Sequence, residues 1–251
     1  MTKAAIKSAR RVFEVMELFE RERQPLGLKF ICETLKYPGS SGAAILKSLV
    51  LLGYLEYDRA TRTYLPTMRI AVMGQWVAKH LFTEAKLLPL MKTLRDKTRE
   101  TIILGTQSGT NAQYVHVMHS LEAIRYMTEP GSIRPLARCG IGLALLAGKS
   151  DEEIDMLVYR SNYAEPNRAR RVALADVMAT IRTIRQQGYY FSRGTYTAGV
   201  GVIAMLLPSA PFNRMFAVGI GGPVYRLEQN LDQNLAAMRK EIKRRLGGKR
   251  A

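Results

Sequence analysis

Apolar residues in the first fifty positions recur every three or four residues in three separate stretches. These stretches cover residues 8–19, 28–35 and 40–52, and proline-containing breaks separate them. Such a period places the apolar side chains of each stretch on one face of a helix. The pattern predicts three short helices, the third with Ser40 or Ser41 as its N-cap and Gly53 at its end. This third helix is expected to bury Gly42, Ile45, Leu46, Leu49 and Leu52.

The period changes after the third helix. Residues 54–57 and 63–65 are rich in aromatic and β-branched side chains, and a charged turn at 58–62 separates them. This pattern predicts a β-hairpin with a basic tip. Three helices followed by a hairpin form a winged helix-turn-helix, a DNA-binding unit that we assign to residues 1–67. An ordinary small α+β subdomain is the alternative reading of the same pattern.

The rest of the chain predicts a linker helix and a second, mixed domain. Residues 68–85 carry an apolar stripe at helical spacing, and a further helix with Pro89 near its first turn runs to about Arg99. Apolar and β-branched runs predict strands at 101–107, 112–118, 199–207 and 216–220, and helical periods predict helices at 151–159 and 172–187. The fold class is α+β, with the linker helix at 68–85 and the second domain at 86–251.

The third helix would enter the major groove of DNA, and its outward face carries mostly small side chains. Projection at 100° per residue places Ser40, Ala43, Ala44 and Lys47 outward. Alanine can touch a thymine methyl, but neither alanine nor serine makes the bidentate base contacts of arginine or asparagine. We expect affinity to come from phosphate contacts and specificity from DNA shape, read by a wing arginine in a narrow minor groove. The expected phosphate contacts are Arg10, Arg11, Ser40, Ser41, Lys47, Arg59 and Arg62.

The charge supports a nucleic-acid partner without locating its site. The 251 residues carry a formal net charge of +17, and the excess is spread along the chain, so a solvated basic surface explains any single arginine equally well. The two cysteines, Cys32 and Cys139, lie in different contexts and are expected to be reduced. No apolar run is long enough to span a membrane, and the first twenty residues lack the core of a secretion signal. We expect a cytoplasmic protein with no membrane partner.

Catalytic and metal-binding patterns are weak. His116 and His119 form an HxxH pair, but residues three apart on a strand face opposite sides, which argues against a metal site. The sequence contains no phosphate-binding glycine loop, no nucleophile elbow and no zinc-type cysteine or histidine cluster. We expect no enzyme activity and no cofactor. A small-molecule-binding protein or enzyme, whose N-terminal helices only dimerise, is the alternative.

Four segments together resemble the IclR family of bacterial transcriptional regulators. They are the helix-turn-helix stretch with Pro38-Gly39-Ser40-Ser41 and LVLLGYL, then PLARCGIGLALLA, IRQQGYYFSRGTYTAGVGVIAMLLP and FAVGIGGPVYRL. The similarity extends from about Ser8 to Leu246, and the order and spacing of the segments carry it. It implies a GAF-like effector-binding domain, an antiparallel sheet flanked by helices, in a regulator that binds operator DNA as a dimer or tetramer.

The resemblance also implies where an effector would bind, and the sequence departs from the family there. Ser192 and Val202 stand at the positions of the family's acidic and cysteine pocket residues, and Gly219 and Gly221 stand at those of its paired serines. We expect a roomier, more apolar pocket for a carboxylate or aromatic metabolite. Possible donors to a carboxylate are Ser192 and the backbone amides of Gly140 and Ile141. The whole expected lining is Tyr126, Met127, Gly140, Ile141, Gly142, Ser192, Val202, Gly219 and Gly221. A sensor domain that no longer binds a ligand is the alternative.

Overall fold

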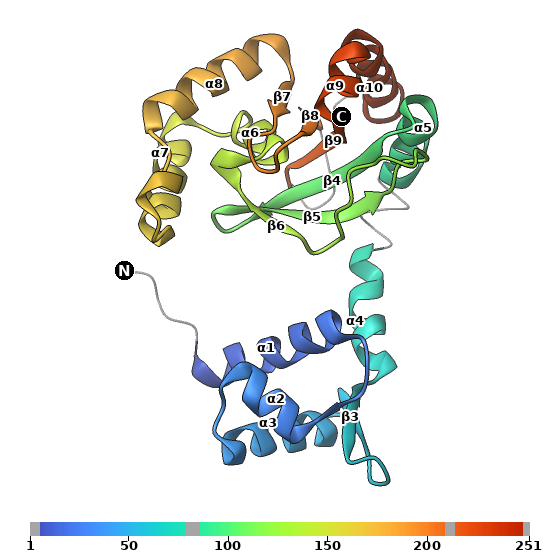
Figure 1. Cartoon of the computed structure of the whole chain (residues 1–251), viewed down its shortest axis with the longest axis vertical. Helices are drawn as coiled ribbons and strands as arrows, with labels where there is room; N and C mark the ends of the chain where they lie inside the picture. The colour runs from blue at the N-terminus through green and yellow to red at the C-terminus, as the bar shows by residue number, and fades with distance from the viewer. Residues whose placement is uncertain (1–5, 79–85, 209–213, 248–251) are drawn as a thin grey trace. The chain divides into compact units, whose positions relative to one another are not determined.

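The computed structural model describes residues 6–78, 86–208 and 214–247, and the chain divides into two compact units, Met1–Lys79 and His80–Ala251 (Figure 1). The first unit contains three helices, a small sheet and a fourth helix. No helix in the described ranges is long and apolar enough to cross a membrane.

The first unit has the predicted winged helix-turn-helix order. Its helices are α1 (Lys7–Glu22), α2 (Leu28–Leu35), α3 (Gly39–Leu51) and α4 (Met68–Ala78). The wing hairpin pairs antiparallel, and the short strand before α2 adds to its edge in the order β1-β3-β2. The strands are β1 (Leu26–Gly27), β2 (Leu55–Asp58) and β3 (Thr63–Pro66). The last seven residues of the predicted linker helix, 79–85, lie outside the described residues.

The core of the first unit follows the predicted helix faces, except that Ile45 is only partly buried and Leu52 is exposed. Eight buried side chains form it: Val15, Leu18, Phe19, Leu26, Ile31, Leu46, Leu49 and Leu55. The prediction that Leu52 is buried was wrong, because α3 ends at Leu51 and Leu52, as the C-cap, is 58% exposed. The N-cap prediction was also wrong: Pro38 holds that position, and neither serine caps the helix. Gly53, with φ +75°, then turns the chain into the wing.

The second unit is built on one six-stranded antiparallel sheet in the order β6-β5-β4-β9-β8-β7. Its strands are β4 (Thr101–Ser108), β5 (Asn111–Met118), β6 (Ile133–Pro135), β7 (Tyr190–Arg193), β8 (Val200–Leu206) and β9 (Phe216–Pro223). Its helices are α5 (Leu87–Thr98), α6 (Gly140–Leu146), α7 (Asp151–Ala164), α8 (Leu174–Gln187), α9 (Val224–Gln229) and α10 (Leu231–Leu246). Two short 3-10 turns lie at Leu136–Arg138 and Arg168–Arg170.

One face of this sheet packs against α6, which lies over β4, β8 and β9 (Figure 1). All seven residues of α6 are buried, and the cluster around them takes in Ile103, Tyr114 and Val202 from the sheet. We call this the inner face. The α+β class and the predicted strands are confirmed. The sequence analysis did not predict α6, β6, β7 and α9, which are too short to show a period, and it also did not predict α10.

A buried carboxylate joins α10 to α5 in the second unit. The side chain of Glu241 on α10 is 2% exposed, and it accepts hydrogen bonds from Lys97 Nζ (2.7 Å) and Arg244 Nη2 (2.6 Å). The hydrogen bonds from Lys97 and Arg244, together with their positive charges, lower the pKa of Glu241 to about 2, from an ordinary value of 4.5. A depressed carboxyl pKa stabilises the folded state above the unfolded value, and this contribution is lost as the pH falls through the folded value.

We therefore expect the second unit to lose stability as the pH falls from about 4.5 toward about 2. Glu241→Gln should lower the free energy of unfolding near pH 7 by about 1–3 kcal/mol, the lower end reflecting the solvent exposure of Lys97 and Arg244. It should also flatten the stability profile in that acid window. Urea unfolding of both proteins across pH tests this, and parallel profiles would contradict it.

Candidate nucleic-acid interface and effector site

The outward face of α3 carries short side chains, as predicted. Ser40, Ala44 and Lys47 are exposed and Ala43 is partly buried. Sequence reasoning missed Leu51, which is 77% exposed and lies one turn after Lys47 on the same face. The helical projection already places Leu51 beside Lys47, but the sequence analysis did not include Leu51 among the outward residues. Leu51 adds an apolar contact to this face and no base-specific donor.

The N-terminal turn of α3 is tied to α1 by one arginine. Arg11 donates to Ser41 Oγ, and its guanidinium lies 4.6 Å from the centre of the Tyr37 ring. Tyr37 in turn donates to Glu14, and burial together with this carboxylate raises the pKa of Tyr37. Arg11 and Ser41, both predicted phosphate contacts, thus contact each other in this structure. Arg10 is exposed and lies 3.4 Å from Glu14.

The wing tip is an ordered turn that presents two arginines. Asp58 accepts hydrogen bonds from the backbone N–H of Ala60 (2.8 Å) and from Thr61 Oγ1 (2.7 Å). The Thr61 hydrogen bond lowers the pKa of the Asp58 carboxyl. Arg59 and Arg62 are exposed, and Arg62 has a left-handed backbone with φ 55°. The turn therefore places both arginines at the outer end of the hairpin.

The start of α4 is fastened to the end of α3. Arg69 Nη1 donates to Leu52 O (2.8 Å), and its guanidinium lies 4.9 Å from the centre of the Tyr54 ring. Thr67 Oγ1 donates to Gly53 O (2.6 Å). These contacts satisfy carbonyl groups that the end of a helix leaves unpaired, so α3 and α4 are held together at this point.

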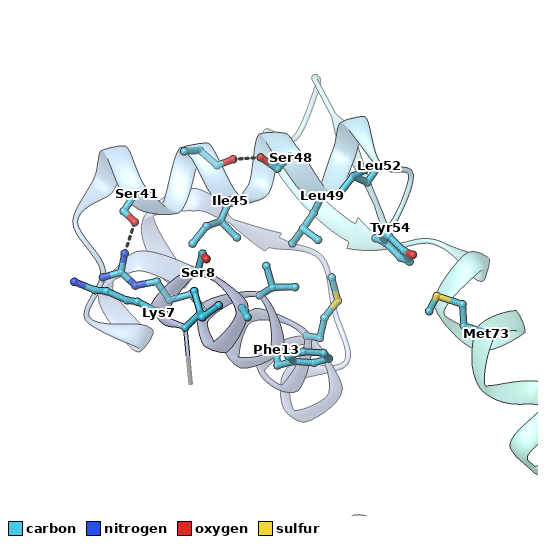
Figure 2. A pocket seen from close by; sticks show the side chains of 16 residues that line it. Lys7, Ser8, Phe13, Ser41, Ile45, Ser48, Leu49, Leu52, Tyr54 and Met73 are labelled. Atoms are coloured by element: carbon cyan, nitrogen blue, oxygen red, sulfur yellow. Dashed lines mark hydrogen bonds between the residues drawn. The ribbon is translucent and has the colours of Figure 1, made fainter. Parts of the chain in front are cut away.

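An open groove of about 990 Å³ runs between α1 and α3 (Figure 2). Its walls are mostly apolar, and Figure 2 shows Phe13 of α1 and Leu52 at the end of α3 beside it, with Met73 on α4. Ser41 and Ala44 also line the groove. Sequence reasoning assigned the apolar stripe of α1 to the core and so did not predict this surface.

The predicted effector residues meet on the inner face of the sheet, with one exception. Val202 pairs with both Ser192 and Gly221, and Gly219 lies between Ile103 and Ala204. Tyr126 is buried beside Gly221, and Gly140 of α6 approaches Val202 and Ser192. Met127 is 55% exposed, and the structure does not bring it into this cluster.

The expectation of a roomier pocket was wrong at both glycine positions. A Cβ atom on Gly219 would lie 2.8 Å from Ile141 Cδ1 and 2.9 Å from Val202 Cγ1. A Cβ atom on Gly221 would lie 2.9 Å from Tyr126 Cδ1. Larger neighbours therefore occupy the volume that serine side chains would take, because protein interiors are closely packed.

Ser192 and the Gly142 amide in this cluster already have partners. Ser192 Oγ accepts from Val202 N (3.2 Å) and lies 3.4 Å from Val202 O. The backbone N–H of Gly142 donates to Cys139 Sγ (3.3 Å), and burial raises the pKa of this thiol to about 12. The described residues include no group of three or more His, Cys, Asp or Glu side chains that could hold a metal ion. An effector here would need a polar group other than Ser192.

Comparisons with known proteins agree on one family. The model of the IclR helix-turn-helix domain matches residues 8–59, and the model of the bacterial transcriptional regulator IclR C-terminal domain matches residues 76–246. The transcriptional regulator KdgR of Escherichia coli K12 is 22% identical over 239 residues, which cover 93% of this chain and 89% of KdgR. The transcriptional repressor IclR of the same organism is 20% identical, covering 98% of this chain and 92% of IclR.

Solved structures agree with the sequence matches. An IclR transcriptional regulator from Alicyclobacillus acidocaldarius superposes with a TM-score of 0.76 at 15% identity, covering 96% of this chain and 98% of that one. The effector domain of an IclR regulator from Acinetobacter sp. ADP1 superposes with a TM-score of 0.62 at 28% identity, covering 68% of this chain and 99% of that one. These relatives are regulators and not enzymes, and because the C-terminal family model alone matches more than half of the sequence, this chain belongs to the IclR family of bacterial transcriptional regulators.

Proposed function

We propose that this regulator binds operator DNA as a dimer, or as a dimer of dimers, and recognises it mainly by phosphate contacts and DNA shape. The observation that carries the proposal is the contrast between α3 and the wing. The exposed side chains of α3 are small or apolar apart from Lys47, whereas an ordered turn presents Arg59 and Arg62. Such a protein acts on the chromosome, which implies a cytoplasmic location.

Phosphate contacts are expected along the surface that joins α1, the start of α3 and the wing. Ser40 and Lys47 are exposed and available to the DNA backbone, as is Arg10. Arg11 and Ser41 would act together, since their hydrogen bond holds the start of α3 against α1. Ala43, Ala44 and Leu51 offer only apolar contacts to thymine methyl groups. The wing arginines would enter a narrow A·T-rich minor groove, where the negative potential favours a guanidinium.

We expect Arg62→Ala to lose sequence preference, and Lys47→Ala to weaken binding to all sequences equally and to reduce the salt slope by about one unit. Binding curves on operator and scrambled DNA across a salt series measure both effects. Arg62→Gly is the matched control for backbone strain, because Arg62 has a left-handed backbone that glycine adopts freely. If instead Lys47 reads a guanine, Lys47→Ala would lose about 1–3 kcal/mol of discrimination at one base pair and Arg62→Ala would lose none.

The dimer contact is assigned to the exposed side of α4 and the adjoining groove. Arg69 is the one charged residue of this eleven-residue helix, and it is engaged with Leu52 O and the Tyr54 ring. Met68 is 76% exposed and Val72 is 62% exposed. A helix without a charged solvent face needs an apolar partner surface. A second copy is the occupant we propose, since two copies would place two wings and two α3 helices on successive half-sites of the operator.

The second unit would sense a small organic metabolite through the cluster around Val202, Gly219 and Gly221. Its apolar surroundings favour a ligand with an apolar body over a very small polar acid. The close packing at both glycines supports the alternative that the sensor has lost its ligand. Measuring DNA affinity while metabolites are titrated distinguishes a sensor that binds a ligand from one that has lost it.

A further inference from the structure

Arg134 is a positive charge on the inner face of the effector sheet. It lies on β6 opposite Ala112 of β5, and facing residues of adjacent antiparallel strands point to the same side. Ala112 and Tyr114, two residues apart, are both buried in the cluster around α6. The side chain of Arg134 therefore points toward the predicted effector site and away from the outer face.

Among the residues that the structure describes, no carboxylate pairs with this arginine. Several described arginines of the second unit have no carboxylate within 4 Å, and all of these except Arg134 are exposed. Its Nη1 donates to the neighbouring Ile133 O (2.8 Å), and its Nε is buried without a hydrogen-bond partner among the described residues. Unpaired buried donors are costly, and in native proteins they call for an explanation.

Two aromatic rings enclose the guanidinium. Its Cζ lies 4.6 Å from the centre of the Tyr196 ring and 5.8 Å from that of the Tyr114 ring. Burial raises the pKa of Tyr114 and of Cys139, and the positive charge of Arg134 opposes both shifts. Cys139 caps α6, so the guanidinium acts electrostatically at the start of this helix, next to Gly140 and Ile141.

Tyr196 reaches Arg134 from the other edge of the sheet. It lies in the loop between β7 and β8, whereas β6 is the opposite edge strand. The loop has left-handed glycines at both ends, Gly194 (φ 68°) and Gly199 (φ 75°), and Gly194 N donates to Val200 O (2.9 Å) at its base. The loop thus folds over the inner face, and the Tyr196 ring covers the guanidinium.

We propose that Arg134 is the anion-binding residue of the effector site, and that Tyr196 covers the site as a lid. The ligand class is an organic carboxylate with an apolar body: Arg134 would bind the carboxylate, and the body would pack against the Tyr114 and Tyr196 rings beside it. This assignment rests on the proposed sensing function. It replaces Ser192 as the expected donor, because Ser192 is engaged with Val202.

The geometry suits a carboxylate for two reasons. A guanidinium presents a planar fork of N–H donors that matches two carboxylate oxygens, and the unpaired Nε belongs to that fork. The two tyrosine rings lie 5.8 Å and 4.6 Å from the guanidinium, and an apolar environment strengthens a charge-assisted hydrogen bond. A neutral amide of the same shape would leave the positive charge uncompensated, so the site should distinguish an acid from its amide.

The test compares three acids with their amides on the full-length protein: acetate, benzoate and phenylacetate against acetamide, benzamide and phenylacetamide, at constant ionic strength. Calorimetric titration should show at least one aromatic acid binding ten or more times more tightly than its amide. Arg134→Gln should bring that ratio close to one, and Arg134→Lys should keep part of it. Arg182→Gln, which removes an exposed arginine from α8, is the matched control and should leave the ratio unchanged.

A second measurement follows the lid without a substitution. Hydrogen exchange of residues 194–199 in the wild-type protein should slow when the tightest-binding acid is present. Absence of binding by all three acids, equal binding of acid and amide, or an unchanged ratio in Arg134→Gln would each overturn the proposal. Salt-dependent binding of the same preparations to DNA, measured without any acid, separates this failure from a failure of the regulator function.

Discussion

Gly142→Ala is expected to lower the free energy of unfolding of the effector unit by about 3 kcal/mol or more. A Cβ atom at this position would lie 2.2 Å from Leu136 O and 2.5 Å from Leu136 Cα, which are backbone atoms of the preceding turn. Backbone cannot move aside as the end of a flexible side chain does, so the turn at Leu136–Arg138 and α6 would have to separate. Because α6 packs on the inner face of the sheet, the loss would spread to the whole core.

Gly140→Ala is the matched control in the same helix. The nearest atoms to a Cβ there, including Ser192 Oγ and Val202 Cβ, lie at 3.2 Å, so small adjustments suffice and about 1 kcal/mol or less is expected. Urea unfolding followed by circular dichroism measures both variants, with the effector unit followed separately if two transitions appear. Equal midpoints for Gly142→Ala and the wild type would contradict the close approach of α6 to Leu136.

Replacing both Met68 and Val72 with glutamine is expected to dissociate the dimer and with it most DNA affinity. Glutamine keeps the helix propensity of α4 and removes two exposed apolar side chains from each copy. Four such side chains in a two-fold interface, at about 1 kcal/mol or more each, correspond to roughly a thousandfold weaker association. Operator binding should fall with it, because one winged helix with such a plain α3 contributes little alone.

Sedimentation at nanomolar to micromolar concentrations, together with operator binding, tests this interface. Glu33→Gln changes an exposed residue of α2, outside α4 and the groove, and should leave both measurements unchanged. A double variant that remains dimeric would show that another surface, such as one on the effector unit, holds the copies together. If the wild-type protein is monomeric at micromolar concentration and still binds the operator with full affinity, the proposal that it binds as a dimer is wrong.

Much of the fold was readable from local patterns because these patterns act over short distances. The three- and four-residue period of α1 and the change of period at the wing reflect which face of each element is buried. The same reasoning identified the outward residues of α3, since one projection determines both faces of a helix. The prediction that Leu52 is buried failed because Gly53 turns the backbone there, and the helical projection no longer applies.

The effector site shows the limit of such reasoning. From the sequence, Gly219 and Gly221 meant missing serine side chains and hence more space. The space at each glycine depends on which residues pack against it, and Ile141, Val202 and Tyr126 come from other elements. In a closely packed interior, neighbouring residues fill the volume that a missing side chain would occupy. The volume of a pocket therefore cannot be predicted from the sequence of one strand.

The sequence by itself determined the family, the order of the three helices and the wing hairpin in the first unit, and the small side chains on the outward face of α3, all of which follow from spacing along the chain. Only the tertiary structure decided which charge faces the effector site. Arg134 and Tyr196 are 62 residues apart and belong to opposite edges of the sheet, and Arg134 lies outside the four segments that resemble the family. They meet because strand order and register place Arg134 on the inner face, and because the loop after β7 folds across it. Such a contact depends on the packing of distant segments, which no local period encodes.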